Sequence, residues 1–221
     1  MGDAPVLDPA VVAKPRLRGV SHEIAAVVFP ILGIWPVLLA HSGARRAAGA
    51  VYVVGMTSMY ATSALYHRGA WSPATKRRLR RLDHSMILVG IAATYTPVVG
   101  VGLGGSAGRI VLVLAWALAA LGVGVRNLWL DAPSWMVAAV YLGVGWLVAA
   151  VFPLLYTHLG VVSFLLVLGG GCVYSLGALV FSRRRPDPSP TVFGYHEVFH
   201  ALVIVAGLLF YAAVWRVLVG P

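Results

Sequence analysis

The sequence predicts an all-α integral membrane protein, a bundle of seven transmembrane helices, and three observations lead to this fold class. Of the 221 residues, 60% are apolar and only 11% are charged, and the mean hydropathy is +0.86. A soluble domain carries about a quarter charged residues, so this composition excludes a soluble globular fold. The apolar residues fall in seven runs, each close to the roughly 20 residues that a spanning helix needs. The basic residues collect in alternate breaks between these runs.

The predicted spans follow one another with short breaks and leave no room for a folded domain outside the membrane. Their ranges are 21–41, 47–67, 83–104, 108–126, 134–156, 159–182 and 196–217. We expect a single seven-helix domain over 20–218, preceded by a basic cytoplasmic tail over 1–19.

Each run is bounded by residues that end helices or resist burial in lipid. The first ends before Arg45 and Arg46, and the second ends at the basic segment 68–81. The third ends at 104–106, a Gly-Gly-Ser sequence, and the fourth ends at 127–133, which closes with a proline. The break between the fifth and sixth runs, near Gly160, is the least marked. Three arginines and three prolines in 183–190 separate the sixth run from the seventh.

The basic residues predict the orientation of the bundle. When the tail and the breaks between spans are assigned in turn to the two sides of the membrane, 13 Lys and Arg residues lie on the side of the N-terminus and 4 lie on the other side. Because Lys and Arg collect in cytoplasmic loops, we expect a cytoplasmic N-terminus and an external C-terminus. The net charge of +10 is therefore a topology signal, and we expect membrane lipids rather than nucleic acid as partners.

Two residue types exclude further classes of protein. The single cysteine, Cys172, excludes an internal disulfide and a cysteine-based zinc site. The only lysines, Lys14 and Lys76, lie outside the predicted spans, which excludes a rhodopsin with a retinal Schiff base.

In the predicted orientation, ionisable residues gather at the cytoplasmic ends of four spans. Five of the seven histidines belong to this group. The residues are His22, Glu23, His67, Asp83, His84, His196, Glu197 and His200. Ionisable groups in membrane spans are costly and usually functional, so this end of the bundle is the candidate site.

His196 and His200 are four residues apart, so their rings project from one helical face, as in a bidentate metal anchor. With Glu197 they match the H-E-x-x-H pattern of zinc proteases, in which the glutamate is the general base. Residues 201–221 contain no His, Asp, Glu or Cys, so a third ligand has to come from earlier in the chain. His67 lies at the matching depth and is our candidate.

Three neutral imidazoles with one open position are typical of a catalytic zinc. Asp83 could orient the water or take its proton, and Ser63, one turn before His67, could bond the water or Asp83. The competing interpretation for His67, His196 and His200 is a set of interfacial histidines hydrated by lipid headgroups. His22 and His84 each adjoin an acid, and we expect them to be interfacial groups or groups that support the site from outside it. For Glu197 we favour a structural role, either a pair with an arginine of an inner loop or an exposed contact with lipid headgroups, over a role as general base.

Four segments carry a resemblance to a known family. They are Ser63-Ala-Leu-Tyr-His67, Leu82-Asp-His-Ser-Met-Ile87, Ala92-Ala-Thr-Tyr-Thr-Pro97 and Phe193-Gly-Tyr-His-Glu-Val-Phe-His200. Together they resemble the hemolysin III family, the bacterial branch of the progestin and adiponectin receptor (PAQR) group. The resemblance implies seven helices, a cytoplasmic N-terminus and a zinc ion on His67, His196 and His200, with Asp83 and Ser63 close by. The segment 16–22 departs from many bacterial members because it lacks asparagine.

The wider group includes alkaline ceramidases, so the resemblance implies a zinc-dependent hydrolase acting on a lipid amide or ester. Two alternatives stay open, a receptor or sensor with a structural zinc and a membrane-damaging cytolysin. A haem protein using two of the histidines is a further alternative. The sequence leaves the substrate and the oligomeric state undetermined.

Overall fold

The structure is a computed structural model that describes residues 14–220, and its regular structure there is helical. The helices are α1 (Val20–Leu38), α2 (Gly43–Arg68), α3 (Pro73–Tyr95), α4 (Gly105–Leu128), α5 (Ser134–Trp146), α6 (Phe152–Arg183) and α7 (Tyr195–Val219). A π-helix, η2 (Thr96–Leu103), continues α3, and a 3₁₀-helix, η3 (Leu147–Val151), joins α5 to α6.

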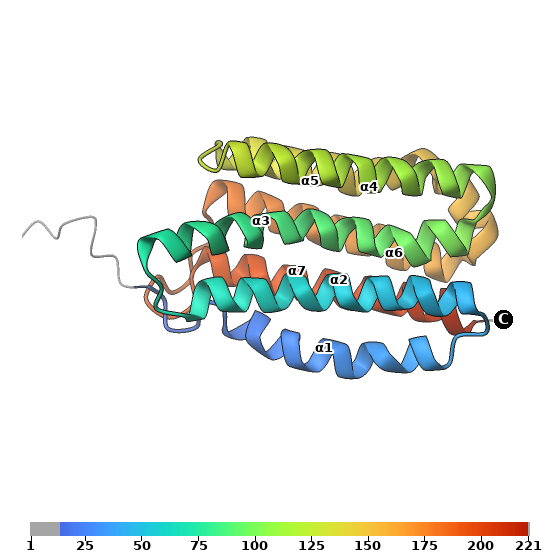
Figure 1. The fold of residues 1–221 in the computed structure, drawn as a ribbon, viewed down its shortest axis with the longest axis horizontal. Coiled ribbons are helices and arrows are strands. Elements are labelled where there is room, and N and C mark those ends of the chain that lie inside the picture. The colour runs from blue at the N-terminus through green and yellow to red at the C-terminus, as the bar shows by residue number, and fades with distance from the viewer. Residues whose placement is uncertain (1–13, 221) are drawn as a thin grey trace, which may run out of the picture.

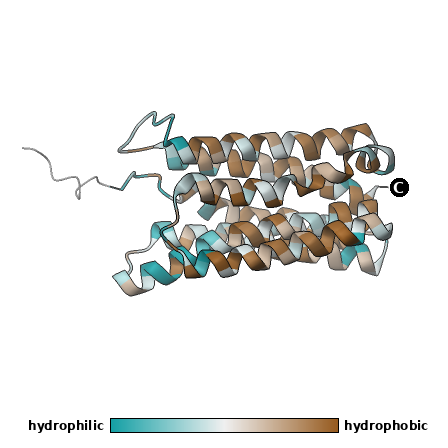
Figure 2. Ribbon diagram, turned by 90° about the horizontal axis from the view of Figure 1, so that it is seen from above, coloured by the Kyte–Doolittle hydropathy of each residue, from teal (hydrophilic) through white to brown (hydrophobic). Residues whose placement is uncertain are grey.

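The helices lie side by side along one long axis, and the chain passes back and forth between the two ends of the bundle (Figure 1). The largest packed pairs are α6 with α7, α1 with α2 and α2 with α3, and α1 also packs against α7. Polar ribbon segments lie mostly at the ends of the bundle, and the shafts are apolar (Figure 2). Large apolar side chains such as Val27, Ile31 and Val113 are exposed on the outer surface, as expected for a surface in contact with lipid.

Five stretches are long and apolar enough to cross a membrane. They are Val20–Leu38, Pro73–Leu103, Gly105–Leu128, Ser134–Arg183 and Tyr195–Val219. The stretch that contains α2 is not among them, and its position explains why. This helix packs against α1, α3 and α7, so much of its surface faces protein and can carry polar residues such as Thr62 and Ser63. The chain is thus a multi-pass membrane protein.

The stretch Ser134–Arg183 has 50 residues, far more than the roughly 20 that one span needs. Gly160 interrupts it with a left-handed backbone, φ 73° and ψ 167°, a conformation that glycine adopts without strain. The chain runs out along α5, η3 and the first turns of α6, and it returns along the part of α6 that follows Gly160 (Figure 1). The helices α5 and α6 pack together. The least marked break in the sequence is therefore a reversal of the chain.

One predicted boundary is wrong. The sequence placed the basic segment 76–81 in a loop and Asp83 at the start of a helix, but α3 begins ten residues earlier, at Pro73. Ser72 caps this end because its Oγ accepts a hydrogen bond from the Thr75 amide at 3.2 Å, and proline is favoured in the first turn. The basic side chains thus lie on the first turns of α3, which places Asp83 inside a helix.

The π-helix η2 begins where the sequence has Tyr95-Thr96-Pro97. The Tyr95 hydroxyl donates to the Gly145 carbonyl at 2.7 Å and accepts from the Val148 amide at 2.9 Å. These bonds hold the end of α3 against the irregular junction between α5 and η3. The distortion therefore fixes one wall of the cavity described below.

Candidate metal centre

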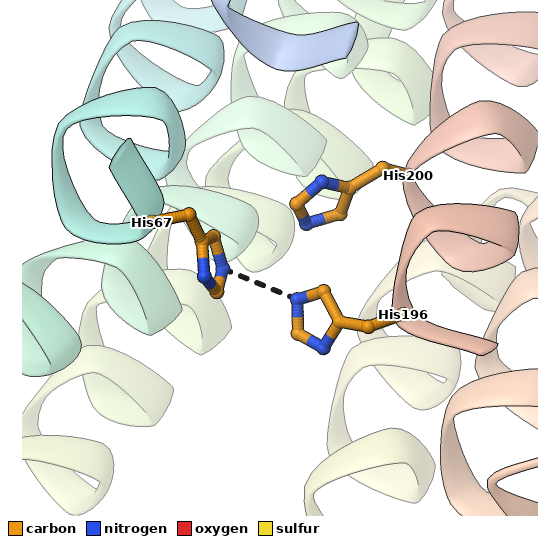
Figure 3. Close-up of side chains that lie close together, drawn as sticks. All are labelled: His67, His196 and His200. Carbon is orange, nitrogen blue, oxygen red and sulfur yellow. Dashed lines mark hydrogen bonds between the residues drawn. The ribbon is translucent and has the colours of Figure 1, made fainter. Parts of the chain in front are cut away.

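The three histidines predicted as ligands come together at one end of the bundle. His67 lies in the last turn of α2, and His196 and His200 lie in the first two turns of α7. One nitrogen from each ring lies within 4.8 Å of the other two. The Nε2 atoms of His67 and His196 are 3.1 Å apart, and the three rings face a common point (Figure 3). The structure thus confirms that these residues form a group that could hold a metal ion.

The donor set fits zinc. Two nitrogens that are each about 2.0–2.1 Å from a tetrahedral zinc lie about 3.3 Å apart, close to the separation of His67 and His196. His67 and His200 are buried, and His196 is half-buried. Neutral imidazoles are common ligands for zinc, and the group supplies three of its four positions.

Asp83 and Ser63 lie beside this group but are not part of it. The Oδ2 atom of Asp83 is 3.9 Å from the Nε2 atom of His67, and both side chains are buried. Ser63 precedes His67 by one turn of α2, is buried, and lines the same cavity as Asp83. The carboxylate therefore lies at the edge of the three-histidine group, where it can reach a water molecule bound there.

Glu197 is not part of the three-histidine group, although it lies between two of its members in the sequence. Its Oε2 atom accepts a hydrogen bond from the Gly194 amide at 2.8 Å, and its Oε1 atom pairs with the Arg18 guanidinium. The carboxylate thus caps the start of α7 and ties it to the segment before α1. Of the two structural roles expected for Glu197, the structure shows the pair with an arginine, although this arginine comes from the segment before α1 rather than from an inner loop. Because Glu197 is buried, the exposed contact with headgroups is wrong.

The segment before α1 covers this end of the bundle. The amides of Arg16 and Leu17 donate to the carbonyls of Thr191 and Val192 at 3.0 and 3.1 Å. Gly19 has a left-handed φ of 82°, and a Cβ atom added there would lie 2.7 Å from the Cβ of His67. Because that contact is closer than real Cβ atoms approach, only glycine lets the chain pass this near to the ligand.

His22 lies against one of the three histidines. The sequence left it as an interfacial or a supporting group, and the structure shows that it is only 3% exposed and stacks on His200. Neither ring nitrogen has a hydrogen-bond partner within residues 14–220, and the same is true of Nδ1 of His200. A single histidine at the start of a span carries no spacing pattern, so the sequence offered no signal for this contact.

His84 was likewise left as an interfacial or a supporting group, and sequence reasoning missed its partner. The Nε atom of Arg126, on α4, donates to Nδ1 of His84 at 3.1 Å, and its Nη2 atom reaches the same nitrogen. Arg126 is buried, although it was counted among the residues of a cytoplasmic loop. The two residues are 42 positions apart, a separation that no local motif marks.

A cavity with mostly apolar walls opens beside the three histidines. Its lining includes Ser63, Asp83, His84, His196 and His200 at one end. It continues between α3, α5, α6 and α7 past Ile91, Val98, Val148, Val167 and Phe210. Asp83 and Tyr95 both line it and are twelve residues apart on α3, which corresponds to about 18 Å along the helix. The cavity is therefore deep, with its histidines and its carboxylate at one end.

Fold and site together define a class, the all-helical multi-pass membrane proteins with a buried group of three histidines beside an apolar cavity. A family model described as "Haemolysin-III related" matches residues 11–211, and the chain belongs to this family. The chain is 30% identical to "Hemolysin-3" of Bacillus cereus over 208 aligned residues, and these residues make up 91% of this chain and 90% of that protein. It is 31% identical over 154 residues to "Hemolysin-3 homolog" of Bacillus subtilis (strain 168), covering 70% of this chain and 69% of that protein.

Proposed function

We propose that the chain crosses the membrane seven times, with its N-terminus in the cytoplasm and its C-terminus outside. The reversal at Gly160 supports the count because it divides Ser134–Arg183 into two passes. The buried position of α2 supports it because a helix enclosed by neighbours can span the membrane without a fully apolar surface. The excess of basic residues on the side of the N-terminus supports the orientation. The three histidines then lie near the cytoplasmic face.

We further propose that His67, His196 and His200 bind one zinc ion and that the protein hydrolyses a lipid amide or ester. A zinc ion with three histidine ligands and one open position lowers the pKa of its bound water to about 7 and so provides a nucleophile at neutral pH. The single observation that carries the proposal is the position of this group, beside Asp83 and at the polar end of a deep apolar cavity.

The residues of the chain have distinct parts in this reaction. Asp83 accepts the proton that the attacking water loses, because its carboxylate lies next to the histidines. The apolar walls bind the acyl chain of the substrate, which places its carbonyl group at the polar end. Glu197 maintains the position of α7, and through it the positions of His196 and His200.

The test uses protein purified in detergent without chelators. Elemental analysis should find one zinc per chain in the wild type and none in His67→Ala. A fluorescent long-chain ceramide should be cleaved by the wild type and left intact by the variant. Zinc without cleavage of ceramide or of a matched lipid ester would support the receptor with a structural zinc. The absence of any transition metal would overturn the site itself.

A further inference from the structure

His84 is held in one tautomer by a buried arginine. Two guanidinium nitrogens of Arg126, Nε and Nη2, approach the same ring nitrogen, Nδ1 of His84. A guanidinium has only donors, so Nδ1 has to be the acceptor. A histidine whose Nδ1 accepts carries its proton on Nε2, and a doubly protonated ring cannot accept these bonds.

The arginine is itself fixed by other bonds. Its Nη1 atom donates to the Trp129 carbonyl at 2.9 Å, and its side chain is buried between α3 and α4, which pack together (Figure 1). Within residues 14–220 it has no carboxylate partner, so its charge is directed at the imidazole rather than neutralised by an acid. The Tyr141 hydroxyl holds the backbone of His84 through its carbonyl at 3.0 Å.

The remaining nitrogen of His84 is available to a ligand. Nε2 makes no hydrogen bond within the described chain, and His84 lines the polar end of the cavity together with Asp83. The half-buried ring therefore offers an N–H donor in the same cavity as the acceptor carboxylate of Asp83. A donor and an acceptor at one end of an apolar cavity match the carbonyl oxygen of a substrate and the water that attacks it.

We propose that His84 is a catalytic residue, a neutral Nε2–H donor that binds the oxygen of the acyl group, and that Arg126 is the positioning residue that fixes its tautomer. This inference rests on the proposed hydrolysis and names the group that recognises the carbonyl.

In the proposed reaction, the oxygen of water adds to the carbonyl carbon while the π electrons move to the carbonyl oxygen. His84 donates a hydrogen bond to that oxygen without losing its proton. The C–O or C–N bond then breaks, and the proton accepted by Asp83 passes to the leaving group.

The tautomer of His84 and its contact with a carbonyl group can be tested by NMR, without an activity assay. In protein labelled with ¹⁵N-histidine, a long-range ¹H–¹⁵N correlation spectrum should show His84 protonated on Nε2 and unprotonated on Nδ1. His84→Gln assigns the signal by its loss. Saturation with palmitamide, which carries an acyl carbonyl on a long chain, should shift the Nε2–H proton downfield. The signal of His158, an exposed residue at the other end of the bundle, should not move. A protonated Nδ1, or a His84 signal that palmitamide leaves unchanged, overturns the proposal.

Two further variants separate this inference from the proposed function. In the ceramide assay, His84→Gln, which keeps an N–H donor, should retain more kcat than His84→Phe. The loss in the phenylalanine variant should be about 10²-fold, with KM changed less. Arg126→Lys keeps a positive charge but not the paired donors, and its His84 signal should show a mixture of tautomers. If the wild type cleaves no lipid but palmitamide shifts the His84 signal, the hydrolase is wrong and His84 stands as an acyl-binding donor.

Discussion

His22 and His200 stack face to face, with ring centroids 3.8 Å apart and planes inclined by 10°. A metal lies in the plane of an imidazole that ligates it, and two parallel planes at this separation share no such point. His22 is therefore not a fourth ligand in this arrangement. A second aromatic neighbour is Tyr60, whose ring packs edge-to-face on His22 with the two ring centroids 5.2 Å apart. The pair of contacts holds His22 as a flat support for the ring of His200.

Variants of His22 should show whether zinc affinity depends on its aromatic face or on its ring nitrogens. His22→Phe keeps an aromatic face against His200, so we expect near-normal zinc affinity. His22→Leu removes that face, and we expect a loss of about 10-fold, the lower end of what is typical for groups that orient ligands. Competition with a chromogenic chelator measures both values. Equal losses in the two variants would show that the nitrogens, and not the stack, matter.

Removing the metal should destabilise the protein. A ligand that binds only the folded state stabilises it by about 2.7 kcal/mol when its free concentration is 100 times Kd. We therefore expect a strong chelator to lower the Tm of the wild type in detergent and added zinc to restore it. His67→Ala serves as the control, because its Tm should be low from the start and should not respond to either treatment.

Glu197→Gln and Asp83→Asn should have opposite effects. Glutamine can still accept the Gly194 amide but loses its charge opposite Arg18, so we expect retained zinc and turnover with a loss of about 1–3 kcal/mol in stability. Asparagine at 83 can hydrogen-bond but cannot accept a proton, so zinc should stay bound while turnover falls by at least about 10²-fold. Metal content, Tm and ceramide cleavage report on each effect. Lost hydrolysis in Glu197→Gln with normal hydrolysis in Asp83→Asn would reverse our assignment of the base.

Gly19→Ala should lower the affinity for zinc, although residue 19 is not one of the proposed ligands. The added methyl group would meet the Cβ of His67 and would also force a left-handed backbone on alanine, which costs about 1–2 kcal/mol. Gly105→Ala is a matched control, because Gly105 also has a positive φ, 60°, but its methyl group would meet nothing within 4 Å. Both variants should lose stability, and only Gly19→Ala should lose zinc affinity. If the two variants bind zinc equally well, the close passage of residue 19 over His67 has no effect on the site.

The proposed orientation can be checked with reporter fusions. An alkaline phosphatase fused to the C-terminus should be active, since this enzyme folds only outside the cytoplasm. A fluorescent protein fused there should stay dark, whereas at the N-terminus it should fluoresce. The reverse pattern would place the histidines near the external face and would refute the topology.

The sequence predicted the parts of this protein that depend on short spacing and on composition. Apolar runs located the helices, most of their ends to within a few residues, and the spacing of His196 and His200 with the depth of His67 located the three-histidine group. The start of α3 was missed because basic residues on a helix that extends beyond the apolar region resemble a loop. The contacts of His22 and His84 were missed because each joins two different helices, and only packing determines which side chains meet there.

The ligands come from two distant parts of the chain, since His67 and His196 are separated by 129 positions. A ribosome makes α2 before α7, so a product that stops short of α7 carries only one of the three proposed ligands, His67. Metal capture at the proposed site would therefore have to follow the synthesis of α7. In cells starved of zinc, we expect protein whose α7 is held less firmly, and such protein is a substrate for the membrane proteases that remove incompletely folded chains.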